Sequence, residues 1–160
     1  MTMPARVSDY LDAQEISYDL VSHQTSSSSM STSFLAHIPM HNIAKAVILE
    51  DHEGHNLMAV LPADRKIDLA KIGQQLSRSF QLAKEDMVYK MFSDCDEGAV
   101  PTMGKAYHMD ACWDESLNSM DDIYFEAGDH ATLVHLDHDG FRQLMKGTKH
   151  FHFSEMAFQQ

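Results

Sequence analysis

The segment from Ala44 to Leu61 constrains the fold of this chain most strongly. Ala44 to Glu50 is a run of small and branched apolar residues, and Asn56 to Leu61 is a second apolar run. The five residues between them, Asp51 to His55, form a polar stretch that contains a glycine. Two apolar runs separated by a short polar turn are typical of a β-hairpin. We therefore expect an antiparallel strand pair in this part of the chain.

The spacing of apolar residues predicts more helices and strands on both sides of this hairpin. Helices are expected at residues 6–14, about 30–37, 68–76, 84–92 and 140–145, the last capped by Asp137 or Asp139, and strands at 16–21, 78–82, 122–127 and 131–136. Thr25 to Ser33 is expected to be a hydroxyl-rich loop, and glycine and proline make residues 93–113 irregular. The mixed order predicts an α+β (mixed α/β) fold with a curved, mixed, largely antiparallel sheet and surrounding helices.

The length of 160 residues is typical of a single domain. We expect one domain over residues 1–160, with its core at about 10–145 and a tail at 146–160 whose Phe151-His152-Phe153 either caps the core or packs on another subunit. No apolar run reaches the roughly 20 residues that span a bilayer, and the first residues lack the apolar region of a signal peptide. The expected location is therefore the cytoplasm, without a membrane partner.

The cysteines and histidines do not form a recognisable metal or disulfide pattern. Cys95 and Cys112 are expected to be reduced thiols, and the acidic neighbours of Cys95 favour a raised thiol pKa. Eleven histidines are present, and several are closely spaced: His37/His41, His52/His55, His135/His138 and His150/His152. A zinc site needs three or four converging ligands, and Pro39 interrupts the one pair with helical spacing. We expect neither a metal nor another cofactor.

The net charge of −12 argues against a protein that coats nucleic acid, and DNA is not an expected partner. The middle of the chain differs from its ends, because residues 65–105 hold 7 basic against 6 acidic groups. Only this part of the chain is expected to present a cationic surface to a phosphate backbone, unless its charges are ordinary solvated pairs.

Lys45 is unusual because it interrupts an apolar strand between Ala44 and Ala46. One interpretation is an outward-pointing lysine that protects an exposed sheet edge. The other is a cation projected from a rigid strand into a cleft, with small neighbours that leave room for a ligand.

The segment from Glu97 to Gly104 contains two glycines and a proline and is expected to be a fixed, irregular loop. One interpretation is a simple connection. The other is a loop that directs several backbone N–H groups toward one point and binds an anion or oxyanion.

These pieces together resemble the YbaK/ProX family of aminoacyl-tRNA deacylases, which are related to the editing domain inserted in prolyl-tRNA synthetase. The resemblance runs from about Tyr10 to Met145. Six segments in this order carry it: Lys45 to Leu49, Val60 to Asp64, Asp68 to Ile72, Gly98 to Pro101 with Gly104, Asp114 to Leu117, and Tyr124 to Asp129.

The resemblance implies a mixed α/β fold whose cleft takes the aminoacyl end of a mischarged tRNA and hydrolyses its ester. It also implies a catalytic role for Lys45 and for the loop residues Gly98, Ala99, Val100, Pro101 and Thr102. Substrate binding is then expected at Gly104, Gly128, Asp129 and His130. The family's loop usually has proline four positions after its glycine, whereas this chain has Thr102 there and Pro101 one position earlier.

Two further interpretations remain open beside hydrolysis of mischarged aminoacyl-tRNA in trans. The acidic balance also suits a non-catalytic module that docks a synthetase or an aminoacyl-tRNA end through the same cleft, and a hydrolase of small aminoacyl esters is a third possibility. Deacylation predicts a positive rim around Lys45, built from residues such as Arg65, Lys66 or Lys105. A continuous acidic rim would favour a protein partner.

Overall fold

The predicted hairpin forms the middle of the structure, a computed structural model that describes residues 3–25, 32–33 and 36–157. Strand β2 (Ala44–Asp51) pairs antiparallel with β3 (Asn56–Pro62), and Lys45 lies opposite Leu61. The Asp51 carboxylate closes the turn, because it accepts hydrogen bonds of 2.9 Å from the backbone N–H groups of Glu53 and His55.

The hairpin belongs to a five-stranded sheet in the order β5-β2-β3-β6-β9, with β5 at Phe80–Leu82, β6 at Asp110–Asp114 and β9 at Lys149–Phe151. Strand β6 runs parallel to β3 and to β9. The prediction that residues 93–113 are irregular throughout was therefore wrong for the last four of them. Strand β6 follows a glycine-containing loop, and its own residues show no alternation of apolar and polar side chains long enough to predict a strand. Its pairing partners are distant in sequence.

The other strands form two smaller antiparallel sheets. One has the order β1-β8-β7, with β1 at Asp19–Ser22, β8 at Thr132–Asp137 and β7 at Asp122–Glu126. The other pairs β10 (Ser154–Met156) with β4 (Arg65–Ile67). The predicted fold class, a single mixed α/β domain with largely antiparallel pairing, is confirmed, although the strands divide among three sheets rather than one.

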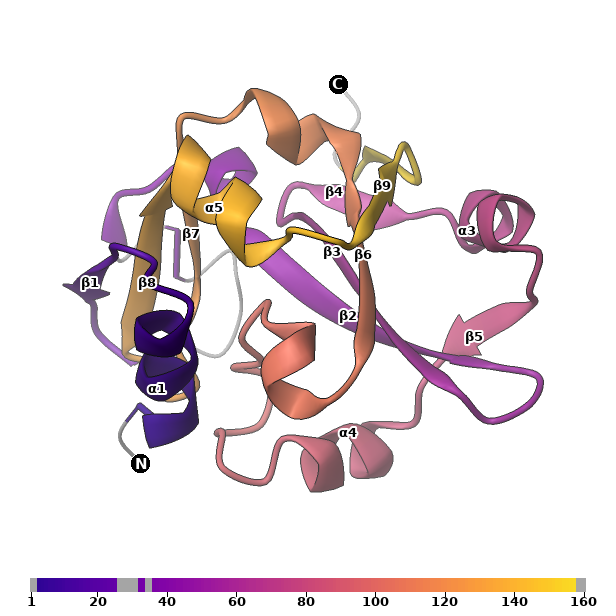
Figure 1. Ribbon diagram of the computed structural model, residues 1–160, viewed down its shortest axis with the longest axis horizontal. Helices are drawn as coiled ribbons and strands as arrows, with labels where there is room; N and C mark the ends of the chain where they lie inside the picture. The colour runs from indigo at the N-terminus through magenta and orange to yellow at the C-terminus, as the bar shows by residue number, and fades with distance from the viewer. Residues whose placement is uncertain (1–2, 26–31, 34–35, 158–160) are drawn as a thin grey trace.

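Helices pack around these sheets (Figure 1). The described α-helices are α1 (Ala5–Ala13), α3 (Leu69–Leu76), α4 (Glu85–Met91) and α5 (His138–Leu144), and short 3-10 turns occur at Met40–Asn42, Gly104–Tyr107 and Glu115–Ser119. Asp137 caps α5, because its carboxylate accepts a 2.7 Å hydrogen bond from the N–H of Gly140. The predicted helix at about 30–37 lies partly outside the described residues. No helix in the described ranges is long and apolar enough to cross a bilayer.

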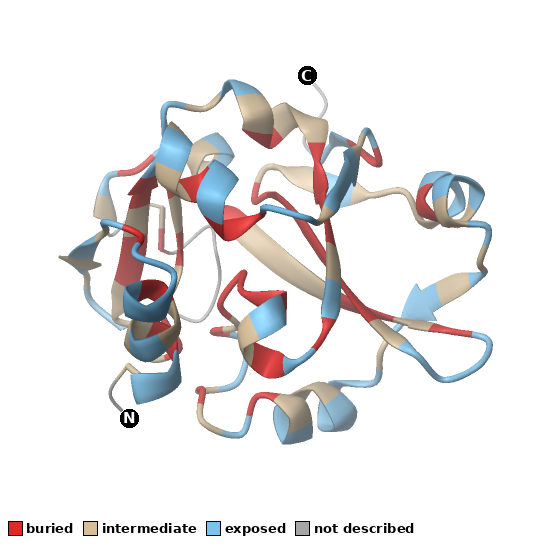
Figure 2. Cartoon of the chain, in the orientation of Figure 1, coloured by how far each residue is buried: buried red, intermediate tan, exposed pale blue. Residues whose placement is uncertain are grey.

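The five-stranded sheet separates two apolar clusters, and Figure 2 shows the buried residues concentrated along its central strands. Side chains of one face enter the larger cluster, which also holds residues of α1, α5 and the β1-β8-β7 sheet: Ala44, Ile48, Met58, Val60 and Trp113. Alternate side chains enter the smaller cluster: Leu49, Leu57, Ala59, Leu61 and Cys112. Strand β3 is buried along nearly its whole length because both its faces are covered.

The C-terminal segment completes the smaller cluster. Phe153 is fully buried there, and its N–H donates a 2.8 Å hydrogen bond to the Asp114 carboxylate at the end of β6. Of the two predicted roles for the aromatic tail, capping of the core is therefore the one that the structure shows. Burial acts to raise the pKa of Asp114, but the hydrogen bonds from Phe153 and Ser116 outweigh it and lower that pKa below its ordinary value.

We expect Asp114→Ala to lower the free energy of unfolding by about 3 kcal/mol, because the buried N–H of Phe153 loses a charged acceptor. In the native protein, Asp114 stabilises the fold fully above its ordinary pKa, and this contribution disappears as the pH falls through the lowered pKa of the folded state. Urea titrations between pH 3 and pH 7 measure both effects. The exposed Asp121 gives the matched control, Asp121→Ala, and equal stability of the two variants at pH 7 would contradict the prediction.

Candidate active site

Lys45 lies near the beginning of β2 and is half-buried. Strand β5 covers the outer edge of β2 only from Leu49 onward, so Lys45 stands on a locally open stretch of that edge. Burial lowers the pKa of the Lys45 ammonium, and the Asp64 carboxylate just after β3 opposes this shift. One oxygen of Asp64, Oδ1, is buried and has no hydrogen-bond partner among the described residues. Lys45 is therefore a partly desolvated cation with an acidic neighbour.

The strand β2 approaches the second sheet immediately before Lys45. A parallel bridge joins Ile43 to Tyr124 of β7, after which the two strands enter different sheets. Lys45 and Glu126 each lie two residues beyond this bridge, and side chains two residues apart on a strand point to the same face. The two ionisable residues therefore flank the place where the sheets separate.

Glu126 is a partly buried acid with histidine neighbours. Its Oε1 accepts a 3.0 Å hydrogen bond from Thr32, while its Oε2 is buried and unpartnered within the described ranges. Burial raises the pKa of Glu126, and the hydrogen bond from Thr32 and the nearby His23 and His130 counteract the rise.

The two histidines also present unpartnered ring nitrogens in the described part of the chain. The Nδ1 of His23 contacts the carbonyl of Gln24 at 2.6 Å, and the Nε2 of His130 contacts the carbonyl of Glu97. A ring nitrogen against a carbonyl carries a hydrogen, so in both rings the nitrogen nearest that carbonyl is the donor. The opposite nitrogen of each ring is buried without a partner among the described residues.

The predicted substrate loop is attached to the turn between β7 and β8. His130 bonds the carbonyl of Glu97, and the N–H of Asp96 donates a 2.8 Å hydrogen bond to the carbonyl of Gly128. Gly98 has a φ of +84°, and a Cβ atom there would lie 3.5 Å from the ring of His130. His130 is therefore placed beside the first residue of the loop.

The backbone of the loop is only partly used in its own folding. The N–H of Ala99 donates to the carbonyl of Asp96 at 3.0 Å. Among the described residues, the N–H groups of Gly98, Val100 and Thr102 donate to no backbone carbonyl. The Ala99 amide is therefore used within the loop, whereas the amides of the exposed Gly98 and the half-buried Val100 are not used in backbone pairing.

Other predicted site residues have structural contacts. Asp129 caps the next strand, because its carboxylate accepts hydrogen bonds of 2.8–3.0 Å from Ala131 and Thr132. Gly128 has a φ of +110°, and a Cβ atom there would lie 2.6 Å from Pro4. Gly104 begins a 3-10 turn and is buried.

Thr102 is fully buried, and its hydroxyl has no hydrogen-bond partner in the described part of the chain. It lines a small cavity of about 10 Å³ together with Tyr10, Leu144 and Met145, and the neighbouring Pro101 is also buried. No hydrogen bond or ion pair between described residues joins Lys45 to this loop, so their position across one cleft stays a prediction.

The buried thiols are free, and burial raises the pKa of Cys95 to about 11 and that of Cys112 to about 12. The predicted direction for Cys95 is confirmed, although burial contributes more than the acidic neighbours. In the ranges that the structure describes, no three histidine, cysteine or acidic side chains lie where they could share a metal ion.

Sequence reasoning missed three residues of this region: Asp64, Glu126 and His23. The alternation of side chains in β7 could have pointed to Glu126. Ile123 and Phe125 are buried on one face of the strand, so Glu126 lies on the other face. No local signal marks His23, which approaches Glu126 only after β1 pairs with β8.

Comparison with solved structures shows that the fold is a known one. The crystal structure of a hypothetical protein superposes with a TM-score of 0.83 at 19% identity, covering 94% of this chain and 99% of the other. A protein described as a candidate trans-editing enzyme for prolyl tRNA synthetase gives a TM-score of 0.75 at 15% identity, covering 94% and 95%. A candidate signal transduction protein from Marinobacter aquaeolei VT8 superposes with a TM-score of 0.79 at 17% sequence identity. The match covers 96% of this chain but only 31% of that protein.

The sequence itself matches a family model. No curated protein sequence matches the chain at a significant level. The model of the aminoacyl-tRNA editing domain matches residues 24–144, a range that begins just after His23 and includes Lys45, the loop from Gly98 and Glu126. This match covers most of the chain and confirms the predicted resemblance. The chain belongs to the aminoacyl-tRNA editing domain family.

Proposed function

We propose that this protein hydrolyses the ester bond of mischarged aminoacyl-tRNA in trans. The observation that carries the proposal is the half-buried Lys45 beside Asp64, on the rigid strand β2 of a chain that belongs to the editing family. An aminoacyl ester is already activated, so its hydrolysis needs a placed water molecule and a stabilised oxyanion more than a strong nucleophile.

Lys45 is proposed to bind either the phosphate of the terminal nucleotide or the ester carbonyl. A charge-assisted hydrogen bond from an ammonium group is stronger than a neutral one, and partial burial strengthens it further. Burial lowers the pKa of Lys45, and the nearby Asp64 carboxylate opposes this shift and favours the charged form.

The loop is proposed to stabilise the developing negative charge. The water oxygen attacks the ester carbon, the bond from that carbon to the ribose oxygen breaks, and a proton passes from the water to the ribose oxygen. The N–H groups of Gly98 and Val100, which donate to no backbone carbonyl among the described residues, are suitable donors to the carbonyl oxygen. The neighbouring 2′-hydroxyl of the terminal adenosine supports the proton transfer, and His130 holds the loop in place.

A panel of mischarged tRNAs tests this proposal directly. We expect at least one of them to lose its amino acid faster with the protein than by spontaneous hydrolysis, measured as acid-precipitable radioactive amino acid over time. A small pocket discriminates one methylene by only about 1–3 kcal/mol, so related amino acids should differ by about 10- to 200-fold in rate. If the protein binds charged tRNA but does not accelerate release of the amino acid, the result would instead support the non-catalytic docking module. The net charge of −12 is the observation that favours this alternative.

A further inference from the structure

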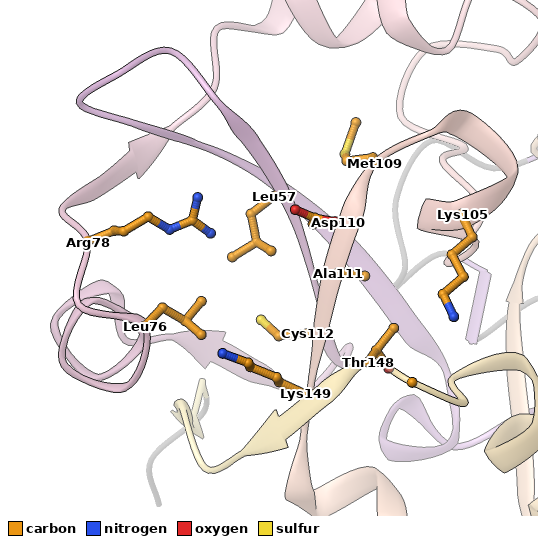
Figure 3. A pocket seen from close by; sticks show the side chains of 11 residues that line it. Leu57, Leu76, Arg78, Lys105, Met109, Asp110, Ala111, Cys112, Thr148 and Lys149 are labelled. Carbon is orange, nitrogen blue, oxygen red and sulfur yellow. The ribbon is translucent and has the colours of Figure 1, made fainter.

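A second site is suggested by a cavity of about 290 Å³ on the outer side of β6 (Figure 3). It contains none of the predicted catalytic or substrate-binding residues, but it includes Lys105, which the sequence analysis had named for a positive rim around Lys45. The cavity lies where β6 extends beyond its pairing with β9, which begins only at Cys112. Its lining combines an apolar wall with three cationic side chains: Leu57, Leu76, Arg78, Lys105, Met109, Asp110, Ala111, Cys112, Gly147, Thr148 and Lys149.

The loop between α5 and β9 contacts Lys105 and is followed by Lys149, and both lysines line the cavity. Lys105 reaches across from its 3-10 turn, and its Nζ donates a 2.5 Å hydrogen bond to the carbonyl of Lys146. Gly147 has a φ of +83°, and a Cβ atom there would lie 3.3 Å from the Lys105 ammonium. Lys149 follows two residues later and lines the same cavity. Figure 3 shows Lys105 and Lys149 reaching the cavity from the two sides of β6, and the positive φ of Gly147 favours glycine in the loop between them.

The positive charge of these lysines is not balanced locally. Arg78, on another side of the cavity, is 3.0 Å from the buried Asp51 and is neutralised by it. Asp110 is the acidic residue in the lining, and neither Lys105 nor Lys149 forms an ion pair with a described residue. A cavity with unpaired ammonium groups, in a chain of net charge −12, favours an anionic ligand.

The lining also indicates which part of a ligand is bound. Among the described residues no aromatic side chain lines the cavity, so a nucleobase would find no stacking partner there. The volume is at the low end of small-molecule sites, which suits a phosphate group better than a whole nucleotide. Leu57 points to the same face of the sheet as Leu61, the partner of Lys45, and four residues of strand separate them by about 13 Å. A tRNA acceptor arm is long enough to reach both places.

We propose that the cavity at Lys105 and Lys149 binds a backbone phosphate of the tRNA, at a distance from Lys45. That the nucleic acid is tRNA rests on the proposed function. That the bound group is a phosphate rests on the lysines in the cavity lining, which form no ion pair with a described residue.

Binding of deacylated tRNA tests this site without any need for hydrolysis. Each lost phosphate contact should weaken binding about fivefold at 0.15 M salt and reduce the slope of log Kd against log salt by about one. We therefore expect the double variant Lys105→Gln/Lys149→Gln to bind about 25-fold more weakly and with a slope lower by about two. The exposed Lys90 of α4 gives the control Lys90→Gln, which changes the same charge away from the cavity and should alter neither quantity. If the double variant fails to fold, the single variant Lys149→Gln replaces it in the binding test, because the Lys149 side chain is exposed.

Two outcomes would overturn the proposal. One is a double variant that binds tRNA with the same affinity and salt slope as Lys90→Gln. The other is a double variant that loses binding of inorganic phosphate or AMP but keeps its affinity for tRNA, because the site would then serve free phosphates. The proposed function can fail separately. If tRNA binding depends on the two lysines but no charged tRNA is hydrolysed, the phosphate site is supported and the hydrolase is not. If charged tRNA is hydrolysed but the double variant binds tRNA like the wild type, the hydrolase is supported and the phosphate site is not.

Discussion

Replacing Lys45 with alanine is expected to lower kcat/KM for deacylation of a good mischarged tRNA by about 10²–10³-fold, which is the usual loss when one donor to a developing oxyanion is removed. The physical reason is that the half-buried ammonium group is partly desolvated, which strengthens a charge-assisted hydrogen bond from it to the substrate. Single-turnover kinetics with purified mischarged tRNA measure the effect. Lys71→Ala, on the exposed side of α3, is the matched control and should retain wild-type kinetics.

The pH dependence gives a second measurement on the same residue. Burial lowers the pKa of Lys45, so its charge and the rate should be lost as the pH rises through a value below that of an exposed lysine. Lys45→Arg keeps its charge over that range, and its rate, after subtraction of spontaneous hydrolysis, should not show this alkaline decrease. Wild-type activity in Lys45→Ala, or an unchanged alkaline limb in Lys45→Arg, would remove the lysine from the mechanism.

Phe153→Ala is expected to lower the free energy of unfolding by about 3–5 kcal/mol, the usual cost of removing a buried phenyl ring. Phe153 is fully buried in the smaller apolar cluster, against the face of the sheet that carries Leu57 and Cys112. Urea denaturation followed by circular dichroism measures the change.

A matched truncation in the same segment separates core packing from an effect of the tail in general. Met156 is 48% exposed, so Met156→Ala should change the stability by less than about 1 kcal/mol. If both variants unfold at the wild-type urea concentration, Phe153 does not belong to the core, and the tail at 146–160 is dispensable for folding.

Local patterns were sufficient for most elements of this fold. The β2–β3 hairpin and helices α1, α3, α4 and α5 are encoded by residues close together in sequence, through alternation, helical spacing and caps such as Asp137. Strand β6 was not predictable in this way, because it pairs in parallel with β3 and β9. The residues that stabilise it lie some fifty positions before it and forty after it, and no local periodicity records them.

The candidate site divides in the same manner. Lys45 and Gly98 were recognisable because a lysine within an apolar strand and a glycine-rich loop are unusual locally. The surroundings of Glu126 were recognisable only in part. His130, in the turn between β7 and β8, was among the predicted residues, whereas His23 follows β1 and comes near Glu126 only through the pairing of β1 with β8.

By itself the sequence determined the mixed α/β class, the family and the two local signals at Lys45 and the loop, because short-range patterning and motif order suffice for these. Only the tertiary structure decided that Asp129 and Gly128 hold the turn together, that Asp64 lies near Lys45, and that the partly buried Glu126 lies near His23 and His130. It also decided that Lys105 and Lys149 share a cavity. Electrostatic and packing interactions depend on distance in space, and strand pairing between remote segments sets those distances.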